Sequence, residues 1–104
     1  MNKYRNIKTK VGDKVFDSRK EAGRYMLLRD REKAGEITDL ATQVKIPITV
    51  CGVKICVYIA DFRYSDGKQY ITEDVKSEIT RKNSTYRLKK KLVKAIYGVT
   101  ITEV

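Results

Sequence analysis

The stretch that decides the fold runs from Val44 to Lys76 and reads VKIPITVCGVKICVYIADFRYSDGKQYITEDVK. Apolar and polar side chains alternate from its start until Cys51-Gly52 breaks the pattern, and a second apolar run covers Lys54 to Tyr64. Asp66-Gly67 is a turn signal, and a third run follows from Gln69 to Lys76. Alternation with a period of two, divided by short turns, is typical of neighbouring antiparallel strands. The stretch therefore predicts a three-stranded meander.

Helices are predicted on both sides of this meander. Ser18 and Glu21 have the Ser-x-x-Glu spacing of a capping box, and Gly35 follows the run as a helix terminator, which predicts a helix from Ser18 to Ala34. A second, cationic helix is predicted over Arg81 to Lys94 and is ended by Tyr97-Gly98. Its core-facing stripe is expected to comprise Leu88, Leu92, Ala95 and Ile96.

The resulting order, αβββαβ, predicts an α+β (α/β-like) fold in one domain over residues 1–104, with a basic N-terminal arm over residues 1–13. Val99-Thr100-Ile101 alternates like a last strand that joins the sheet after the helical crossover, and an additional short strand is expected around Lys14-Val15-Phe16. Pro47 lacks a backbone N–H, so the first strand of the meander is expected at an edge or with a bulge.

The composition excludes several functional classes. The chain has 23 Lys and Arg against 13 Asp and Glu, a formal net charge of +10, and no histidine. Ser-His-Asp and Cys-His catalysis are therefore excluded, and Cys51 and Cys56 are too few for a four-ligand zinc site. No dinucleotide-binding or P-loop glycine pattern occurs. A strongly basic chain of this kind favours a nucleic-acid partner.

The same composition gives no sign of a membrane protein. No apolar run approaches the ~20 residues of a membrane span, and the polar opening Met1-Asn2-Lys3-Tyr4-Arg5 lacks the apolar core of a signal peptide. We therefore expect an intracellular protein without a membrane partner. Cys51 and Cys56 should then stay reduced and act as small apolar side chains of the hairpin.

Three charged residues of the meander suggest chemistry. Asp74 and Lys76 are two apart on the third strand and so project from one side, and Asp61 near the end of the second strand lies within reach of Asp74 across the turn. Two carboxylates at close range repel each other, and a hard divalent cation reverses that penalty. The spacing predicts a Mg²⁺ site, which Mn²⁺ can also fill, with the backbone carbonyl of Val75 as a further oxygen ligand.

An acidic pair with a lysine two residues later suits phosphodiester hydrolysis in a cationic protein. Lys76 is then expected to orient or deprotonate the attacking water, or to stabilise charge on the phosphate. The alternative is that Asp61 and Asp74 are structural residues paired with neighbouring cations. Glu21 leaves a similar choice, because it lies on the apolar arc of its helix with Ala22, where it either completes the capping box or serves a site.

Longer motifs add a family resemblance. They are Phe16-Asp17-Ser18-Arg19-Lys20-Glu21-Ala22, Tyr58-Ile59-Ala60-Asp61-Phe62, Glu73-Asp74-Val75-Lys76 and Tyr86-Arg87-Leu88-Lys89-Lys90-Lys91-Leu92. Over about residues 4–104 the chain resembles small phage-encoded proteins of the PD-(D/E)XK nuclease superfamily, and its order and spacing are similar to those of the phage endonucleases that resolve four-way DNA junctions. The resemblance implies a restriction-endonuclease-like core, in which a mixed central sheet is flanked by helices, and the host cytoplasm as location.

The resemblance also assigns residue roles. Glu21 matches the helical carboxylate, Asp61 and Asp74 the metal-binding acids, and Lys76 the lysine. The chain departs from the pattern at three positions: Ala60 stands for the eponymous proline, Asp74 for the commoner glutamate and Ser77 for a frequent glycine. Glu73 is a rival ligand if the strand is bulged, although only Asp74 shares a face with Lys76.

The leading hypothesis is therefore a Mg²⁺-dependent endodeoxyribonuclease that acts on Holliday junctions or other branched DNA. Backbone phosphates are expected to contact the cationic helix, through Arg87, Lys89, Lys90 and Lys91. Symmetric cutting of two strands requires two matching sites, so a homodimer is expected. Two alternatives stay open, a non-catalytic nucleic-acid-binding protein on the same fold and a nuclease without junction selectivity.

Overall fold

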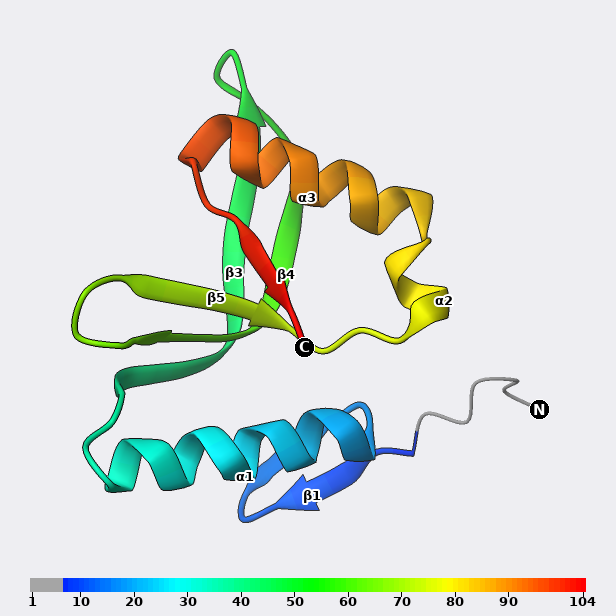
Figure 1. The fold of residues 1–104 in the computed structure, drawn as a ribbon. Coiled ribbons are helices and arrows are strands. Elements are labelled where there is room, and N and C mark those ends of the chain that lie inside the picture. The colour runs from blue at the N-terminus through cyan, green and yellow to red at the C-terminus, as the bar shows by residue number, and fades with distance from the viewer. Residues whose placement is uncertain (1–6) are drawn as a thin grey trace.

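The meander forms the first three strands of a four-stranded mixed sheet in the computed structural model, which describes residues 7–104 (Figure 1). Its strands, in the spatial order β3-β4-β5-β6, are β3 (Thr38–Val50), β4 (Val53–Ser65), β5 (Tyr70–Asp74) and β6 (Ile101–Glu103). Strands β3, β4 and β5 pair antiparallel, whereas β6 pairs parallel to β5 after the helical crossover. The predicted α+β class with a mixed sheet flanked by helices is confirmed.

A hairpin and three helices complete the part of the chain that the structure describes. These elements are β1 (Thr9–Val11), β2 (Lys14–Phe16), α1 (Arg19–Lys33), α2 (Glu78–Arg81) and α3 (Ser84–Tyr97). Helix α1 begins where the Ser18 side chain accepts the Glu21 N–H, and α3 ends at Gly98, whose φ of 71° is the left-handed conformation that glycine tolerates. The short strand expected around residues 14–16 is confirmed, and β1 is its partner.

Several boundaries differ from the predictions. The first meander strand begins at Thr38 rather than Val44, and the third ends at Asp74 rather than Lys76. The predicted helix over Arg81 to Lys94 is divided between α2 and α3, because the Asn83 side chain accepts the Tyr86 N–H and starts a new helix. Pro47 lies on the edge strand β3, as expected, in register with Val57.

The buried face of α3 was predicted wrongly. Its buried residues are Tyr86 and Val93, whereas Leu88 is 59% exposed and Ile96 is 40% exposed. Leu92 is half-buried against the core, and Ala95 is exposed. The helix is therefore rotated from the expected position, because the aromatic ring of Tyr86 packs against Tyr58 on β4.

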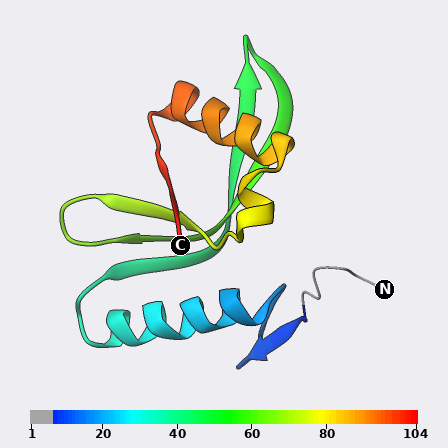
Figure 2. The same cartoon turned by 45° about the vertical axis from the view of Figure 1, so that its right-hand side comes forward.

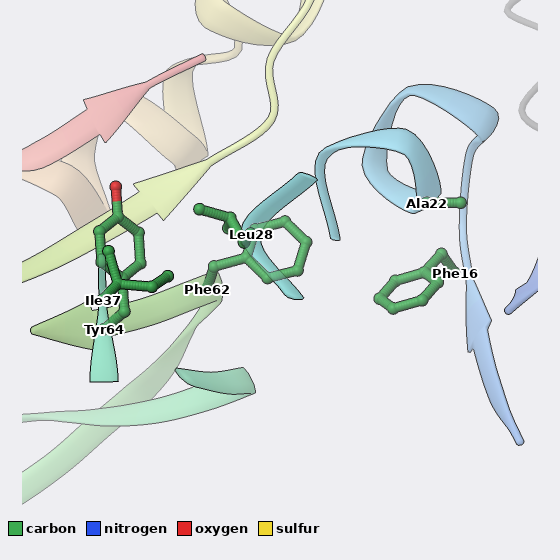
Figure 3. Close-up of a cluster of buried hydrophobic side chains, with 6 residues drawn as sticks. All are labelled: Phe16, Ala22, Leu28, Ile37, Phe62 and Tyr64. Atoms are coloured by element: carbon green, nitrogen blue, oxygen red, sulfur yellow. The ribbon is translucent and has the colours of Figure 1, made fainter. Parts of the chain in front are cut away.

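Two hydrophobic clusters form the core, and β4 belongs to both. Phe62 and Tyr64 pack with α1 and β2 in the first cluster (Figure 3), whereas Tyr58 and Ala60 pack with α3 and β6 in the second. Figure 2 shows the reason, because the long β3–β4 ribbon curves between α3 at one end and α1 at the other. Asp61 lies between Ala60 and Phe62, at the point where β4 passes from one cluster to the other.

The predictions for the basic arm and for the two cysteines have the following outcomes. Residues 1–6 of the predicted basic arm lie outside the described residues, and the rest of the arm includes β1. Cys51 and Cys56 are free thiols in the β3–β4 turn and in β4, as expected for reduced cysteines of a hairpin. None of the helices between residues 7 and 104 has the length and apolar character needed to cross a membrane.

Candidate functional site

Asp61 and Asp74 meet where β4 and β5 separate. The Asp61 backbone N–H donates to Asp74 Oδ1 at 2.8 Å, and the Val75 N–H donates to Asp61 Oδ2 at 2.9 Å. Each carboxylate thus binds the backbone of the opposite strand, and the pair closes the end of the β4–β5 ladder. The predicted approach of the two aspartates is therefore found in the structure, with Val75 contributing its amide to the same cluster.

Glu21 projects from the first turn of α1 toward the same cluster. Glu21 is 6% exposed, and the side-chain amide of Gln43 donates to its Oε2 at 3.4 Å. Burial first, and then the charge of Asp61 and a hydrogen bond to that carboxyl, raise the pKa of Glu21 to about 8. Only the Ser18 half of the predicted capping box is present, so the Glu21 side chain belongs to the acidic cluster rather than to the helix cap.

The cluster has too few partners for its charge. Burial raises the pKa values of Asp61 and Asp74, although backbone hydrogen bonds and the charge of Lys76 act in the opposite direction. Asp74 Oδ2 is buried without a hydrogen-bond partner, and it is the only carboxylate oxygen among the three such side-chain atoms in residues 7–104. An unpaired buried carboxylate oxygen is costly, which makes this position suited to a cation or a proton.

Lys76 lies beyond the end of β5 and close to the acids. Its Nζ is 4.2 Å from the centroid of the Tyr86 ring, and its charge lowers the pKa of both Asp61 and Asp74. Because β5 ends at Asp74, strand alternation does not fix the Lys76 side chain. Its backbone N–H instead donates to the Val104 carbonyl at 3.1 Å, which keeps the segment beside β6.

Glu73, the rival to Asp74, points to the opposite face of β5. Arg24 Nε lies 2.8 Å from Glu73 Oε1, Arg24 Nη2 lies 2.6 Å from Oε2, and the Tyr64 hydroxyl donates to Oε2. This two-pronged ion pair satisfies both oxygens of a side chain that is almost fully buried. Glu73 is therefore held by α1 and β4, away from the Asp61–Asp74 pair.

The donor set suits a hard divalent cation, but it is not preassembled. Between residues 7 and 104, no group of three or more Asp, Glu, His or Cys side chains is arranged to hold a metal ion. Asp61 Oδ2 and Asp74 Oδ1 are engaged by backbone amides, whereas Asp74 Oδ2 is unpaired. Carboxylate oxygens fit Mg²⁺ or Mn²⁺ chemically, and each aspartate has a second oxygen that these backbone N–H groups do not engage.

Comparison with known protein families places the chain in one of them. A family model matches residues 1–102, almost the whole sequence. The chain belongs to the family "Protein of unknown function (DUF1064)". No curated protein and no solved structure gave a match. The acidic cluster described above is thus a feature of a DUF1064 domain.

Three residues of the DUF1064 site were not foreseen from the sequence. Gln43 has a positive φ of 52° and donates to Glu21, Lys20 Nζ donates to the Lys76 carbonyl at 2.9 Å, and Tyr86 supports the Lys76 ammonium. The alternating pattern of the first strand gives no signal for the backbone turn at Gln43. Lys20 precedes Glu21 in the helix motif, which is the one sequence feature that connects it with the site.

Only two of the four cationic residues predicted to contact phosphates are exposed on helix α3 of the DUF1064 domain. Arg87 and Lys91 are exposed, as expected of phosphate-binding residues. The other two predicted contacts are engaged within the domain, since Lys89 Nζ donates to the Val57 carbonyl at 3.2 Å and Lys90 Nζ lies 3.3 Å from Glu103 Oε2. The rotation of α3 explains this difference, because it turns Lys89 and Lys90 toward the sheet.

Proposed function

We propose that this DUF1064 protein is a metal-dependent endodeoxyribonuclease that hydrolyses phosphodiester bonds in branched DNA. The observation that carries the proposal is the buried Asp74 Oδ2, which has no partner among residues 7–104 and lies beside Asp61 and Glu21 in a protein with a net charge of +10. A structural acid cluster in so basic a chain would be expected to recruit a lysine or arginine to that oxygen, as Glu73 recruits Arg24. The free oxygen instead supports a role for an external cation.

Glu21, Asp61 and Asp74 would hold Mg²⁺, or Mn²⁺ in its place, with the Val75 carbonyl as a further oxygen donor. The ion would activate water and polarise the scissile phosphate. The chain's own contribution is that the carboxylates of half-buried Asp61 and buried Asp74 accept backbone N–H groups across the strand end, which fixes the distance between β4 and β5 at the reaction centre.

Lys76 would serve the attacking water or the phosphate. Its ammonium is close enough to act on both aspartates, and the Tyr86 ring limits where the side chain can lie. A cation there stabilises negative charge that develops on a phosphate oxygen. Arg87 and Lys91 are exposed on α3 and would position the DNA backbone.

Branched DNA is proposed as substrate because of the motif resemblance to phage junction-resolving endonucleases. The same resemblance is the reason for proposing the host cytoplasm as the location. Cleavage of two strands at symmetric positions calls for a homodimer with two matching sites. A nuclease with the same site but without junction selectivity is the variant of this proposal that differs only in substrate shape.

A non-catalytic nucleic-acid-binding protein is the second candidate, and one observation favours it. The carboxylates of Asp61 and Asp74 accept backbone N–H groups across the strand end, which is a structural task in its own right. In this reading the cationic residues bind the nucleic acid and the acids only close the sheet.

Cleavage of a labelled four-way junction beside a linear duplex of matched sequence separates these candidates. Wild type, Asp61→Asn, Asp74→Asn and the control Asp30→Asn are compared in Mg²⁺, Mn²⁺ and EDTA. We expect paired nicks in the junction with either metal, a loss of about 10²–10³-fold in both site variants, and wild-type rates for Asp30→Asn, whose side chain is 69% exposed on α1.

Other results have distinct meanings. Equal cutting of both substrates would support the nuclease and remove junction selectivity. Tight binding without cutting in either metal would favour the binding protein, and cutting that survives Asp61→Asn in clean protein would show that the proposed site is wrong.

A further inference from the structure

A groove between α3 and β6 lies next to the acidic cluster. It encloses about 620 Å³, and the charged side chains that line it are Arg81, Arg87, Lys90, Lys91, Lys94 and Glu103. Glu103 on β6 is the register partner of Asp74 on β5, and the charges of Glu103 and Lys90 both act on the Asp74 carboxyl. The groove is therefore one strand away from the proposed reaction centre, and five cations face one carboxylate in it.

Glu103 occupies the middle of these cations. The Tyr86 hydroxyl donates to Glu103 Oε2 at 2.7 Å, Lys90 Nζ lies 3.3 Å from the same oxygen, and Arg81 Nε lies 3.4 Å from Oε1. The Glu103 side chain is 22% exposed, so solvent reaches the carboxylate. One hydroxyl and two cations that surround a carboxylate oxygen pair are also suitable donors for a phosphate oxygen pair.

Arg87 and Lys91 stand on the outer wall of the groove. They are one helical turn apart on α3, both are exposed, and no side-chain hydrogen bond or ion pair engages them within the described part of the chain. Lys94 continues the same wall and donates to Thr100 Oγ1 at 2.9 Å. The wall thus offers two unengaged cations beside the two that Glu103 already neutralises.

We propose that the α3–β6 groove binds a backbone phosphate of the nucleic acid, and that Glu103 is an internal counter-anion which this phosphate displaces from Arg81 and Lys90. The identity of the ligand rests on the proposed function. Displacement of one anion by another leaves the two cations paired in both states, while the Glu103 side chain, which solvent already reaches, becomes hydrated. Glu103 then weakens the binding of any single phosphate and holds the groove in shape when no nucleic acid is present.

Binding of a fluorescent linear duplex, followed by anisotropy in EDTA at several salt concentrations, tests the displacement. Glu103→Gln keeps the size of the side chain and its Tyr86 contact, and Glu36→Gln makes the same change in net charge on the exposed turn after α1. We expect Glu103→Gln to bind about three- to tenfold more tightly than wild type at low salt, with Glu36→Gln close to wild type. Equal affinities for the two variants, or weaker binding by Glu103→Gln, would overturn the proposal.

A lysine pair tests the groove independently of the folding of the Glu103 variant. Lys91→Ala removes a groove cation, and Lys33→Ala removes an exposed cation from the last turn of α1. The proposal expects Lys91→Ala alone to weaken binding severalfold and to reduce the slope of log affinity against log salt by about one. Identical losses for the two lysines would show that binding is diffuse and would overturn the groove.

These measurements need no metal, so they separate the groove from the nuclease. Tighter binding by Glu103→Gln in a protein that cuts nothing would support the groove and overturn the proposed function. Metal-dependent cutting with unchanged binding in the groove variants would overturn the groove and leave the nuclease standing.

Discussion

Glu73 and Asp74 are neighbours on β5 and each is 1% exposed, but their carboxylates differ in the partners that the domain gives them. Glu73 faces α1, where Arg24 and the Tyr64 hydroxyl pair both of its oxygens. Asp74 lies on the side of Lys90 and α3 and shares its surroundings with Asp61, and one of its oxygens has no partner within the described residues. The difference shows that the fold neutralises one buried acid with an internal cation and leaves the other with an oxygen that has no partner among residues 7–104.

The largest effect expected from this comparison is the loss of the Glu73 ion pair. Arg24→Ala leaves a nearly fully buried carboxylate without its cation and should lower the free energy of unfolding by about 3 kcal/mol. Urea denaturation followed by circular dichroism measures this, with Arg24→Lys as the variant that retains charge but loses the two-pronged contact. A change below the error of the measurement would contradict the structural role of Glu73.

The acidic cluster should make the stability of the domain depend on pH. The pKa of Glu21 is raised to about 8 from an ordinary 4.5, so the native chain holds a proton that the unfolded chain releases. Stability should therefore fall as pH rises from about 4.5 to about 8, and Asp61 and Asp74 act in the same direction because their pKa values are also raised. Glu21→Gln should reduce the fall by about 1–2 kcal/mol, as measured by thermal unfolding at pH 5, 6.5 and 8.

The control for that experiment is Glu36→Gln, an exposed acid on the turn after α1. It should keep the wild-type pH dependence. If the stability of wild type and of Glu21→Gln changed with pH in the same way, burial and the neighbouring acids would not be raising the pKa of Glu21.

A divalent cation should stabilise one side of β5 and not the other. At ten times its dissociation constant, Mg²⁺ bound only by the native state contributes about 1.4 kcal/mol. The melting temperature at pH 7.5 should therefore rise by roughly 6–7 °C with Mg²⁺ in wild type and in Arg24→Lys, and by nearly nothing in Asp74→Asn. An equal rise in Asp74→Asn would place the cation elsewhere.

The smallest effect is expected for the Tyr64 hydroxyl. Tyr64→Phe removes its hydrogen bond to Glu73 but leaves the Arg24 pair and the ring packing in the first hydrophobic cluster. The free energy of unfolding should fall by about 1 kcal/mol in urea denaturation. A loss as large as that of Arg24→Ala would mean that the hydroxyl, rather than the guanidinium, supports Glu73.

Much of the fold could be predicted from local patterns. The meander, the Ser18 cap of α1 and the Gly98 end of α3 depend on alternation and on turn or cap residues, which are read within a few positions of the chain. The rotation of α3 could not be read in this way. Its exposed Leu88 and buried Tyr86 depend on which side of the helix meets Tyr58, a residue of another element.

For the candidate site, too, local patterns predicted some features, and contacts between distant elements decided the others. Strand alternation correctly separated Asp74 from Glu73, and the turn at Asp66-Gly67 correctly brought Asp61 near Asp74. The surroundings of these acids could not be predicted, because Gln43 reaches Glu21 through a left-handed backbone residue in the middle of β3. The engagement of Lys89 and Lys90 was likewise hidden, since their partners are a β4 carbonyl and a β6 carboxylate.

The sequence by itself determined the order of the main elements, the basic charge and the two aspartates that meet where β4 and β5 separate, because these follow from side-chain periodicity, composition and short turns. Only the tertiary structure decided which acid is neutralised. Arg24 is distant from Glu73 in the chain, and a buried charge is compensated by whatever side chain the packed helix brings to it. Asp74 Oδ2 is the counterpart of that pairing, because it is buried and no hydrogen-bond partner reaches it from the described residues 7–104.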